Sequence, residues 1–117
     1  MILLGKKISL FVYDFDGVMT DNRAMIFNNG DESVLINRSD GLAIEKIKSF
    51  GIDQIIISTE TNDIVMKRAE KLGIFAVNGV KNKLEELNKY ITKKKLALSQ
   101  TAYIGNDIND IEAMSIV

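Results

Sequence analysis

Cysteine and histidine are both absent from the 117 residues of the chain. Without cysteine there is no disulfide, no thiol nucleophile and no zinc–thiolate centre. Without histidine there is no Ser-His-Asp triad, no imidazole general base and little basis for a transition-metal site. Any catalysis must therefore use carboxylates, hydroxyl groups, lysines and a hard cation that prefers oxygen ligands.

The chain also lacks a large excess of positive or negative charge and a long apolar run. The formal net charge of −1 gives no electrostatic reason to expect nucleic acid or an anionic membrane as a partner. No apolar run approaches the roughly 20 residues of a membrane span, and Gly5, Lys6 and Lys7 break the run after Met1, so no signal peptide is recognisable. We expect a cytoplasmic protein, with residues 1–117 forming one domain.

The most informative stretch is Ile8–Gly17, which begins as a β-favouring apolar run and ends in Asp14, Phe15, Asp16 and Gly17. Such a run is typical of a strand buried on both faces of a parallel sheet. In an extended chain Asp14 and Asp16 point the same way, and carboxylates about 7 Å apart repel unless a positive group lies between them. A divalent metal is the obvious candidate. The alternative is a strand that runs into an acidic Asp-Gly turn.

Short strands and helices alternate along the rest of the chain. Strands at 23–27 and 32–36 around the turn 28–31 predict a hairpin whose apolar side chains need the main body or another subunit as cover. The further elements expected are a helix over 41–50 with Ala43, Ile47 and Phe50 on its buried side, a strand over 52–58, a helix capped by Thr61 or Asn62 and ended by Gly73, a strand over 74–77, a helix from Asn82 to about Lys93–Lys95, a strand over 101–104 and a last helix that begins within 105–110. This alternation predicts an α/β fold with a doubly wound, mostly parallel sheet.

Polar residues gather where the predicted strands end, which is the edge at which sheets of this kind bind ligands. They are Asp14, Asp16, Ser58, Thr59, Glu60, Asn106, Asp107 and Asp110, with Lys83 at the start of the helix after the third strand. Taken singly, Ser58 could cap a strand end and Lys83 could be a solvated residue. Their joint placement predicts one site.

These motifs resemble those of the haloacid dehalogenase (HAD) superfamily of phosphotransferases. Asp14–Val18 with Thr20 matches the first motif, Ser58 the second, Lys83 the third and Gly105–Asp110 the fourth, in order and spacing over essentially the whole chain. No cap insertion separates the motifs, and a hairpin follows the first. The chain therefore resembles the capless phosphatases of 3-deoxy-octulosonate or deoxy-nonulosonate phosphates, and equally the phosphatase-like domain of some N-acylneuraminate cytidylyltransferases.

The resemblance implies a Rossmann-like core and a Mg²⁺-dependent phosphatase that acts on a sugar-acid phosphate. Asp14 would attack phosphorus to give an aspartyl-phosphate, and Asp16 would serve as general acid and then general base. The residues that the resemblance assigns to the phosphate are Ser58, Thr59 and Lys83, and those that it assigns to Mg²⁺ are Asp14, Asp16, Asn106, Asp107 and Asp110.

Four residues are expected to contact the rest of the substrate. Glu60 with Lys71 resembles the nonulosonate branch, whereas octulosonate phosphatases tend to have Gly-Arg after the second-motif residue. A loop glutamate and a lysine in the last turn of a helix would look the same. Arg38 and Gly41 lie where the family has an Arg-Asp-Gly-like loop near the site.

Two departures from the family pattern concern the metal and the C-terminus. Asn106 stands where these phosphatases usually carry the aspartate that binds the metal, so one negative charge is lost. The family fold normally continues with a strand, a helix and a glycine-rich tail, so we expect a C-terminally truncated domain whose sheet lacks an edge strand.

The capless design also implies a homo-oligomer, a tetramer in which the hairpin and tail of one subunit cover the site of the next. A second hypothesis is a non-catalytic oligomerisation module tied to sialic-acid activation, which Asn106 and the short C-terminus favour. A third is a response-regulator-like phosphoacceptor. It would need an acceptor aspartate after Ile57, which the chain lacks.

Overall fold

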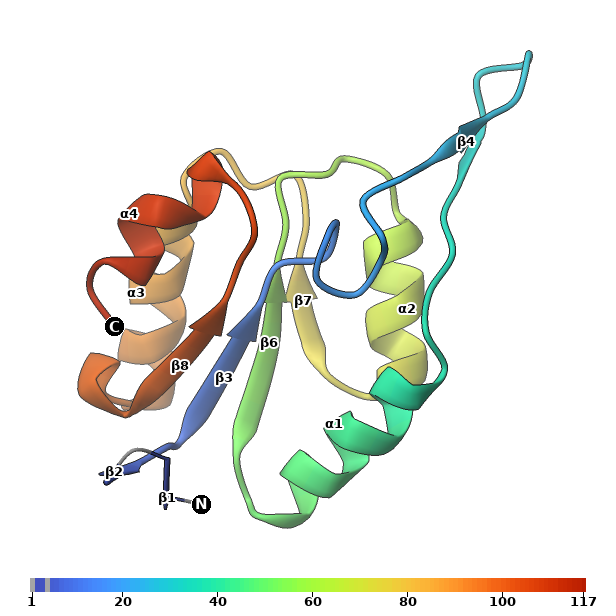
Figure 1. The fold of residues 1–117 in the computed structure, drawn as a ribbon. Coiled ribbons are helices and arrows are strands. Elements are labelled where there is room, and N and C mark those ends of the chain that lie inside the picture. Colours follow the sequence, from blue (N-terminus) through green and yellow to red (C-terminus); the bar gives the residue numbers. More distant parts are fainter. Residues whose placement is uncertain (1, 4) are drawn as a thin grey trace.

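The central sheet of the chain contains four parallel strands in the order β7-β6-β3-β8 (Figure 1). The computed structural model describes residues 2–3 and 5–117. The strands are β3 (Leu10–Tyr13), β6 (Asp53–Ile57), β7 (Phe75–Val77) and β8 (Thr101–Ile104). The predicted α/β fold is confirmed, and the described residues include no cap domain.

Strand β3 forms the centre of the molecule because both of its faces are apolar. Leu10 and Val12 pack toward one side of the sheet, and Phe11 and Tyr13 toward the other. All four side chains are buried, as the apolar run predicted. Each side chain of this kind contributes roughly 1.5–3 kcal/mol when it is fully buried.

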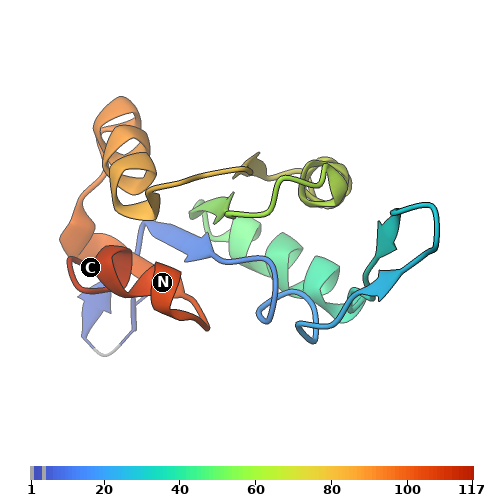
Figure 2. The same cartoon turned by 90° about the horizontal axis from the view of Figure 1, so that it is seen from above.

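Helices cover both faces of the sheet (Figure 2). Helices α1 (Ser39–Ser49) and α2 (Ile64–Leu72) pack with Phe11 and Tyr13, and α3 (Lys83–Lys94) and α4 (Ile111–Met114) lie on the other face. Gly73 ends α2 in the left-handed conformation, as predicted.

The predicted buried side of the first helix was wrong. Ala43 and Phe50 are exposed, whereas Ile44 is buried and Ile47 is partly buried. The helix begins at Ser39 and Phe50 lies beyond its last residue, so the stripe that faces the sheet runs through Ile44 and Ile47.

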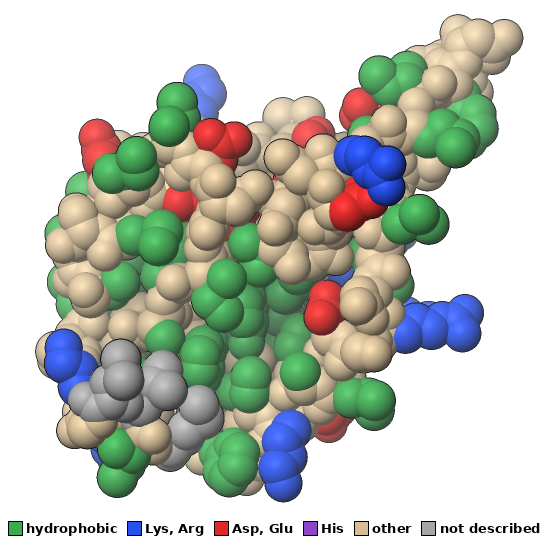
Figure 3. Space-filling view, in the orientation of Figure 1, with side chains coloured by type: hydrophobic (Ala, Val, Ile, Leu, Met, Phe, Trp, Pro, Cys, Tyr) green, Lys and Arg blue, Asp and Glu red, His purple; other side chains and the backbone are tan. Residues whose placement is uncertain are grey.

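The predicted hairpin projects from the body as β4 (Met25–Ile26) and β5 (Glu32–Ser33), which are shorter than expected (Figure 1). A bridge between Thr20 and Ile36 closes its base. Apolar side chains lie on the surface of this projection (Figure 3). They are Met25, Ile26, Phe27 and Leu35, whose exposed fractions range from 47% to 78%.

The remaining elements are short. An antiparallel pair, β1 (Ile2–Leu3) and β2 (Lys6–Lys7), precedes the sheet and was not predicted. Two 3-10 turns, η1 (Leu98–Gln100) and η2 (Ile108–Asp110), flank β8. Over the described residues, the chain has no helix of the length and hydropathy that a membrane span requires.

Backbone hydrogen bonds carry the sheet pairing one residue past the strand ends. The Asp14 amide donates to the Ile104 carbonyl over 2.9 Å, and the Ser58 amide donates to the Val77 carbonyl over 2.9 Å. These bonds hold the first and second motifs at the same edge of the sheet, where Lys83 begins α3.

Candidate active site

Lys83 is the cation at the centre of this edge. Its ammonium lies 3.0 Å from Asp14 Oδ1 and 2.7 Å from Asp110 Oδ1. Its side chain is 1% exposed, so water screens these pairs very little. Asn82 places it by capping α3, because the Asn82 side chain accepts a hydrogen bond from the Glu85 amide. The sequence thus brings the third motif directly against the first and the fourth.

Asp110 is fully buried, and both of its carboxylate oxygens accept hydrogen bonds. Its Oδ1 accepts from Lys83 and from the Tyr103 hydroxyl, and its Oδ2 accepts from the Asn106 and Asp107 amides. Burial alone raises the pKa of Asp110, but the hydrogen bonds from Lys83 and Tyr103 outweigh it and hold the pKa below its usual value. These contacts argue against the predicted role of Asp110 as a metal ligand.

The two oxygens of Asp14 have different surroundings. Oδ1 accepts from the Phe15 amide over 2.7 Å and lies against Lys83. Oδ2 makes no hydrogen bond within the described residues, where no buried side-chain oxygen is left without a partner, so it reaches solvent. Burial raises the pKa of Asp14, and the Lys83 ammonium offsets part of that rise. One oxygen is anchored, and the other is free to react.

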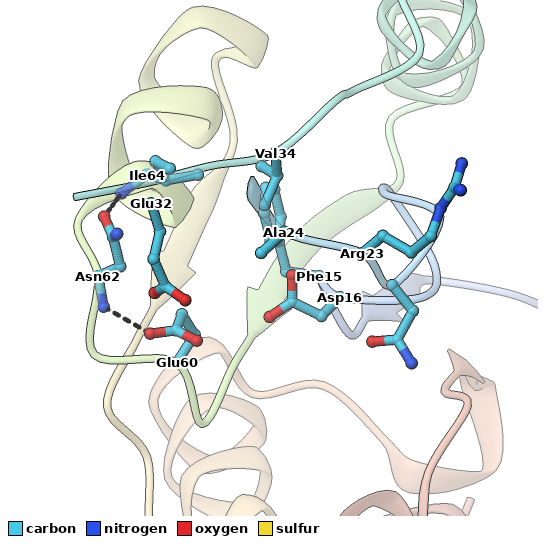
Figure 4. A pocket seen from close by; sticks show the side chains of 10 residues that line it. Phe15, Asp16, Arg23, Ala24, Glu32, Val34, Glu60, Asn62 and Ile64 are labelled. Atoms are coloured by element: carbon cyan, nitrogen blue, oxygen red, sulfur yellow. Dashed lines mark hydrogen bonds between the residues drawn. The ribbon is translucent and has the colours of Figure 1, made fainter. Parts of the chain in front are cut away.

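Asp16 faces a cavity of about 150 Å³ between the base of the hairpin and the loop after β6 (Figure 4). The carboxylates of Glu32 and Glu60 point toward one another in this cavity, and Asp16 faces the same space. Burial raises the pKa of Asp16, and the charges of Glu60 and Glu32 raise it further. A carboxyl group in this setting is suited to donating a proton.

The second-motif loop is held tightly around Ser58. Ser58 is buried, and its hydroxyl oxygen accepts from the Glu60 amide over 3.1 Å while its carbonyl accepts from the Val80 amide. Its hydroxyl proton remains available to a ligand. Thr59 is exposed and accepts from Asn109 over 3.4 Å, which links this loop to the fourth motif.

The oxygen donors near Gly17 suit a hard cation, although the carboxylate count is low. Among residues 2–3 and 5–117, no group of three or more acidic, histidine or cysteine side chains is placed to hold a metal. Asn106 lies directly against Gly17. The oxygens of the Asp14 carboxylate, the Asp16 carbonyl and the Asn106 amide are of the kind that Mg²⁺ prefers. Asp107 instead caps η2 by accepting from the Ile108 amide.

Three predicted substrate residues lie away from this cluster within one chain. Lys71 is in the last turn of α2, at the opposite end of that helix from Asn62 and Glu60. Arg38 is exposed at the start of α1, and Gly41 packs near Leu72 at the same far end of α2. Glu60 alone lines the cavity beside Asp16.

Two site residues were missed from the sequence. Glu32 reaches the cavity only because the base of the projecting hairpin lies beside the loop after β6, and no local pattern indicates that. Tyr103 did carry a signal, because a tyrosine on a buried strand beside the fourth motif needs a partner for its hydroxyl.

No protein-family model matches the chain. Curated relatives match it by sequence, among them a bacterial phosphatase and a fish cytidylyltransferase. The 3-deoxy-D-manno-octulosonate 8-phosphate phosphatase of Escherichia coli is 31% identical over 100% of this chain and 63% of its own length. N-acylneuraminate cytidylyltransferase A of Danio rerio is 25% identical over 93% of this chain and 26% of its own length. The chain therefore spans less than two thirds of either relative.

Solved structures share the fold closely. A chain from Streptomyces avermitilis described as a HAD family hydrolase superposes with a TM-score of 0.93 at 35% identity, over 100% of this chain and 67% of its own. The 3-deoxy-D-manno-octulosonate 8-phosphate phosphatase of Moraxella catarrhalis, solved with a magnesium ion, a phosphate ion and a KDO molecule, has a TM-score of 0.86 at 34% identity. The superposition covers 91% of this chain and 62% of the Moraxella catarrhalis chain.

Motif order, site geometry and these matches agree over the length of the chain. The chain belongs to the haloacid dehalogenase superfamily.

Proposed function

We propose that the chain hydrolyses the phosphate monoester of a 3-deoxy sugar acid through an aspartyl-phosphate. The observation that carries the proposal is the asymmetry of Asp14, whose Oδ1 is held by Lys83 and the Phe15 amide while Oδ2 is open. The octulosonate phosphate phosphatases of Escherichia coli and Moraxella catarrhalis, which are similar to the chain, support the choice of substrate class.

In the first step Asp14 Oδ2 bonds to phosphorus as the ester P–O bond breaks. Asp16 gives its proton to the departing sugar oxygen, for which its raised pKa suits it. In the second step water attacks the same phosphorus and passes a proton to Asp16. The bond between phosphorus and Asp14 then breaks, which releases inorganic phosphate and restores both carboxyl groups.

The remaining residues neutralise and orient the phosphoryl group. The Lys83 ammonium opposes its negative charge, and the Ser58 hydroxyl donates to one of its oxygens. Asp14, the Asp16 carbonyl and Asn106 would hold Mg²⁺, which when bound offsets the charge of the phosphoryl oxygens. Because Asn106 is neutral, we expect the affinity for Mg²⁺ to be lower than with aspartate at this position.

The apolar hairpin supports a homo-oligomer, with a tetramer as the expected form. Side chains as exposed as Ile26 and Leu35 on a narrow ribbon are unfavourable in water unless a second surface covers them. A neighbouring subunit would supply that surface.

A second candidate is a non-catalytic module of a sialic-acid-activating enzyme. Asn106 favours it, and so does the match to the cytidylyltransferase. One experiment separates the two candidates: phosphate release from octulosonate 8-phosphate and nonulosonate 9-phosphates, with and without Mg²⁺. Mg²⁺-dependent turnover supports the phosphatase. A folded wild-type chain without turnover, in which Asn106→Asp restores activity, supports the module.

A further inference from the structure

Tyr103 lies on β8, two residues before the loop that carries Asn106. Its hydroxyl donates to Asp110 Oδ1 over 2.8 Å, and the Lys83 ammonium donates to the same oxygen over 2.7 Å. The Asn106 and Asp107 amides donate to Oδ2 over 3.1 and 3.4 Å. An ionised carboxylate offers about four acceptor positions, and here four donors use them.

The Asp110 carboxylate therefore connects three elements that the chain brings together only on folding. Lys83 belongs to α3, Tyr103 to β8, and the two amides to the loop after β8. Gly105 makes room for this arrangement, because a β-carbon there would lie 2.6 Å from Asp110 Cγ. The exposed fraction of Asp110 is 0%, so its hydrogen bonds are all made within the protein.

The orientation of this carboxylate sets the position of the Lys83 ammonium. Lys83 donates a hydrogen bond to Asp110 over 2.7 Å and forms an ion pair with Asp14 at 3.0 Å. The Tyr103 hydroxyl holds Asp110 Oδ1 in the orientation that keeps the ammonium between the two carboxylates. Without the hydroxyl, the Asp110 carboxylate would lose one of its four donors and rotate, and the Lys83 ammonium would shift with it.

We propose that Tyr103 is a positioning residue, whose hydroxyl fixes the Asp110 carboxylate and, through it, both Lys83 and the Asn106 loop. The effect on catalysis rests on the proposed function, in which Lys83 and Asn106 serve the phosphate and the metal. The effect on the loop does not depend on that function.

The test compares Tyr103→Phe with Tyr90→Phe. Tyr90 is a matched control because it is buried in the apolar cluster against which Tyr103 packs, and its hydroxyl bonds to no residue that the structure describes. Its ring instead stacks on Phe75, with ring centroids 5.6 Å apart. Both variants keep an aromatic ring and lose one hydroxyl.

Amide hydrogen exchange measured by NMR without metal is the first readout. The NMR resonances of the Asn106 and Asp107 amides should shift in Tyr103→Phe, and these amides should exchange about tenfold faster. A tenfold factor is about the effect expected from the loss of one buried hydrogen bond. They should be unchanged in Tyr90→Phe. Exchange in a folded Tyr103→Phe that matches the control overturns the proposal.

Steady-state hydrolysis of p-nitrophenyl phosphate with Mg²⁺ is the second readout. In Tyr103→Phe we expect kcat to fall about tenfold with KM changed less than twofold, because Lys83 is displaced where charge develops in the transition state. If the wild type releases no phosphate from p-nitrophenyl phosphate, octulosonate 8-phosphate or nonulosonate 9-phosphates, the proposed function fails while the amide exchange still decides the role of Tyr103.

A third variant covers the case in which Tyr103→Phe does not fold. p-Aminophenylalanine at position 103 keeps a donor at the same end of the ring. It should restore the wild-type exchange of the Asn106 and Asp107 amides. Failure to restore it in a folded protein contradicts the assignment.

Discussion

The side chain of Asn106 lies directly over the backbone of Gly17. A β-carbon at residue 17 would fall 1.8 Å from Asn106 Nδ2, and the φ angle of Gly17 is +83°. The first and fourth motifs thus touch at a position where only glycine fits, beside the oxygen atoms proposed to hold the metal.

Gly17→Ala should displace Asn106 and abolish Mg²⁺ binding measured by isothermal titration calorimetry. The positive φ adds a strain of about 1–2 kcal/mol for alanine. Gly30→Ala is the matched control, since Gly30 has a φ of +91° with nothing within 4 Å of the added carbon. In denaturant unfolding, Gly30→Ala should have a lower free energy of unfolding than the wild type because of this strain. Its affinity for Mg²⁺ should be unchanged. Equal Mg²⁺ affinity in both variants would contradict the proposed ligand.

Lys83→Met should lower the free energy of unfolding by about 3–5 kcal/mol at pH 7, because it leaves two buried carboxylates without their cation. The pKa of Asp110 is lowered in the folded state, so its contribution to stability is present at neutral pH and is lost as the pH falls through that pKa. The difference in the free energy of unfolding between wild type and Lys83→Met should therefore become smaller toward acidic pH.

Lys89→Met is the control for that series. Lys89 is exposed on the same helix, and its partners among the described residues are Glu85 and Glu86. Its removal should change stability by less than about 0.5 kcal/mol at any pH in the series. A gap for Lys83→Met that stays constant with pH would mean that the carboxylates are not the cause.

Glu32→Gln should move the alkaline limb of the kcat profile to lower pH. The pKa of Asp16 is raised by burial and then by the charges of Glu60 and Glu32, and removal of one charge lowers it. The general acid must be protonated to act, so a lower pKa ends activity at a lower pH. Glu45→Gln, on the exposed side of α1, should leave the profile unchanged. A profile unaffected by Glu32→Gln would remove that residue from the site.

Ile26→Asp should convert the oligomer to monomers in sedimentation experiments. Ile26 is 71% exposed on the hairpin, and a carboxylate there is costly only if another subunit covers it. Leu42→Asp is the control, because Leu42 is 76% exposed on α1 of the body. A wild-type chain that sediments as a clean monomer would end the oligomer hypothesis.

The sequence was informative where one local pattern sets the structure. Leu10–Tyr13 is apolar on both sides, a pattern typical of a central strand of a parallel sheet. Asn82 begins one helix and Gly73 ends another by local chemistry. The motifs fall at strand ends, so their convergence follows from parallel topology.

The parts that could not be predicted depend on long-range packing. Glu32 joins Asp16 because the base of the hairpin lies beside a loop distant in sequence. Asp110 carries the carboxylate chemistry of a ligand, yet four donors from three elements engage it, and spacing alone cannot reveal that. Lys71 matches a motif in sequence while α2 carries it to the opposite end of the helix from Glu60.

The central claim is that Asp14 carries the phosphoryl group during turnover. Acid quenching during turnover, followed by borohydride reduction, converts an aspartyl-phosphate to homoserine, which mass spectrometry of the peptide around residue 14 detects. We predict homoserine at position 14 in the wild type, and neither homoserine nor phosphate release in Asp14→Asn. Phosphate release that persists in Asp14→Asn, or a reduced carboxyl group at a residue other than Asp14, would contradict the account.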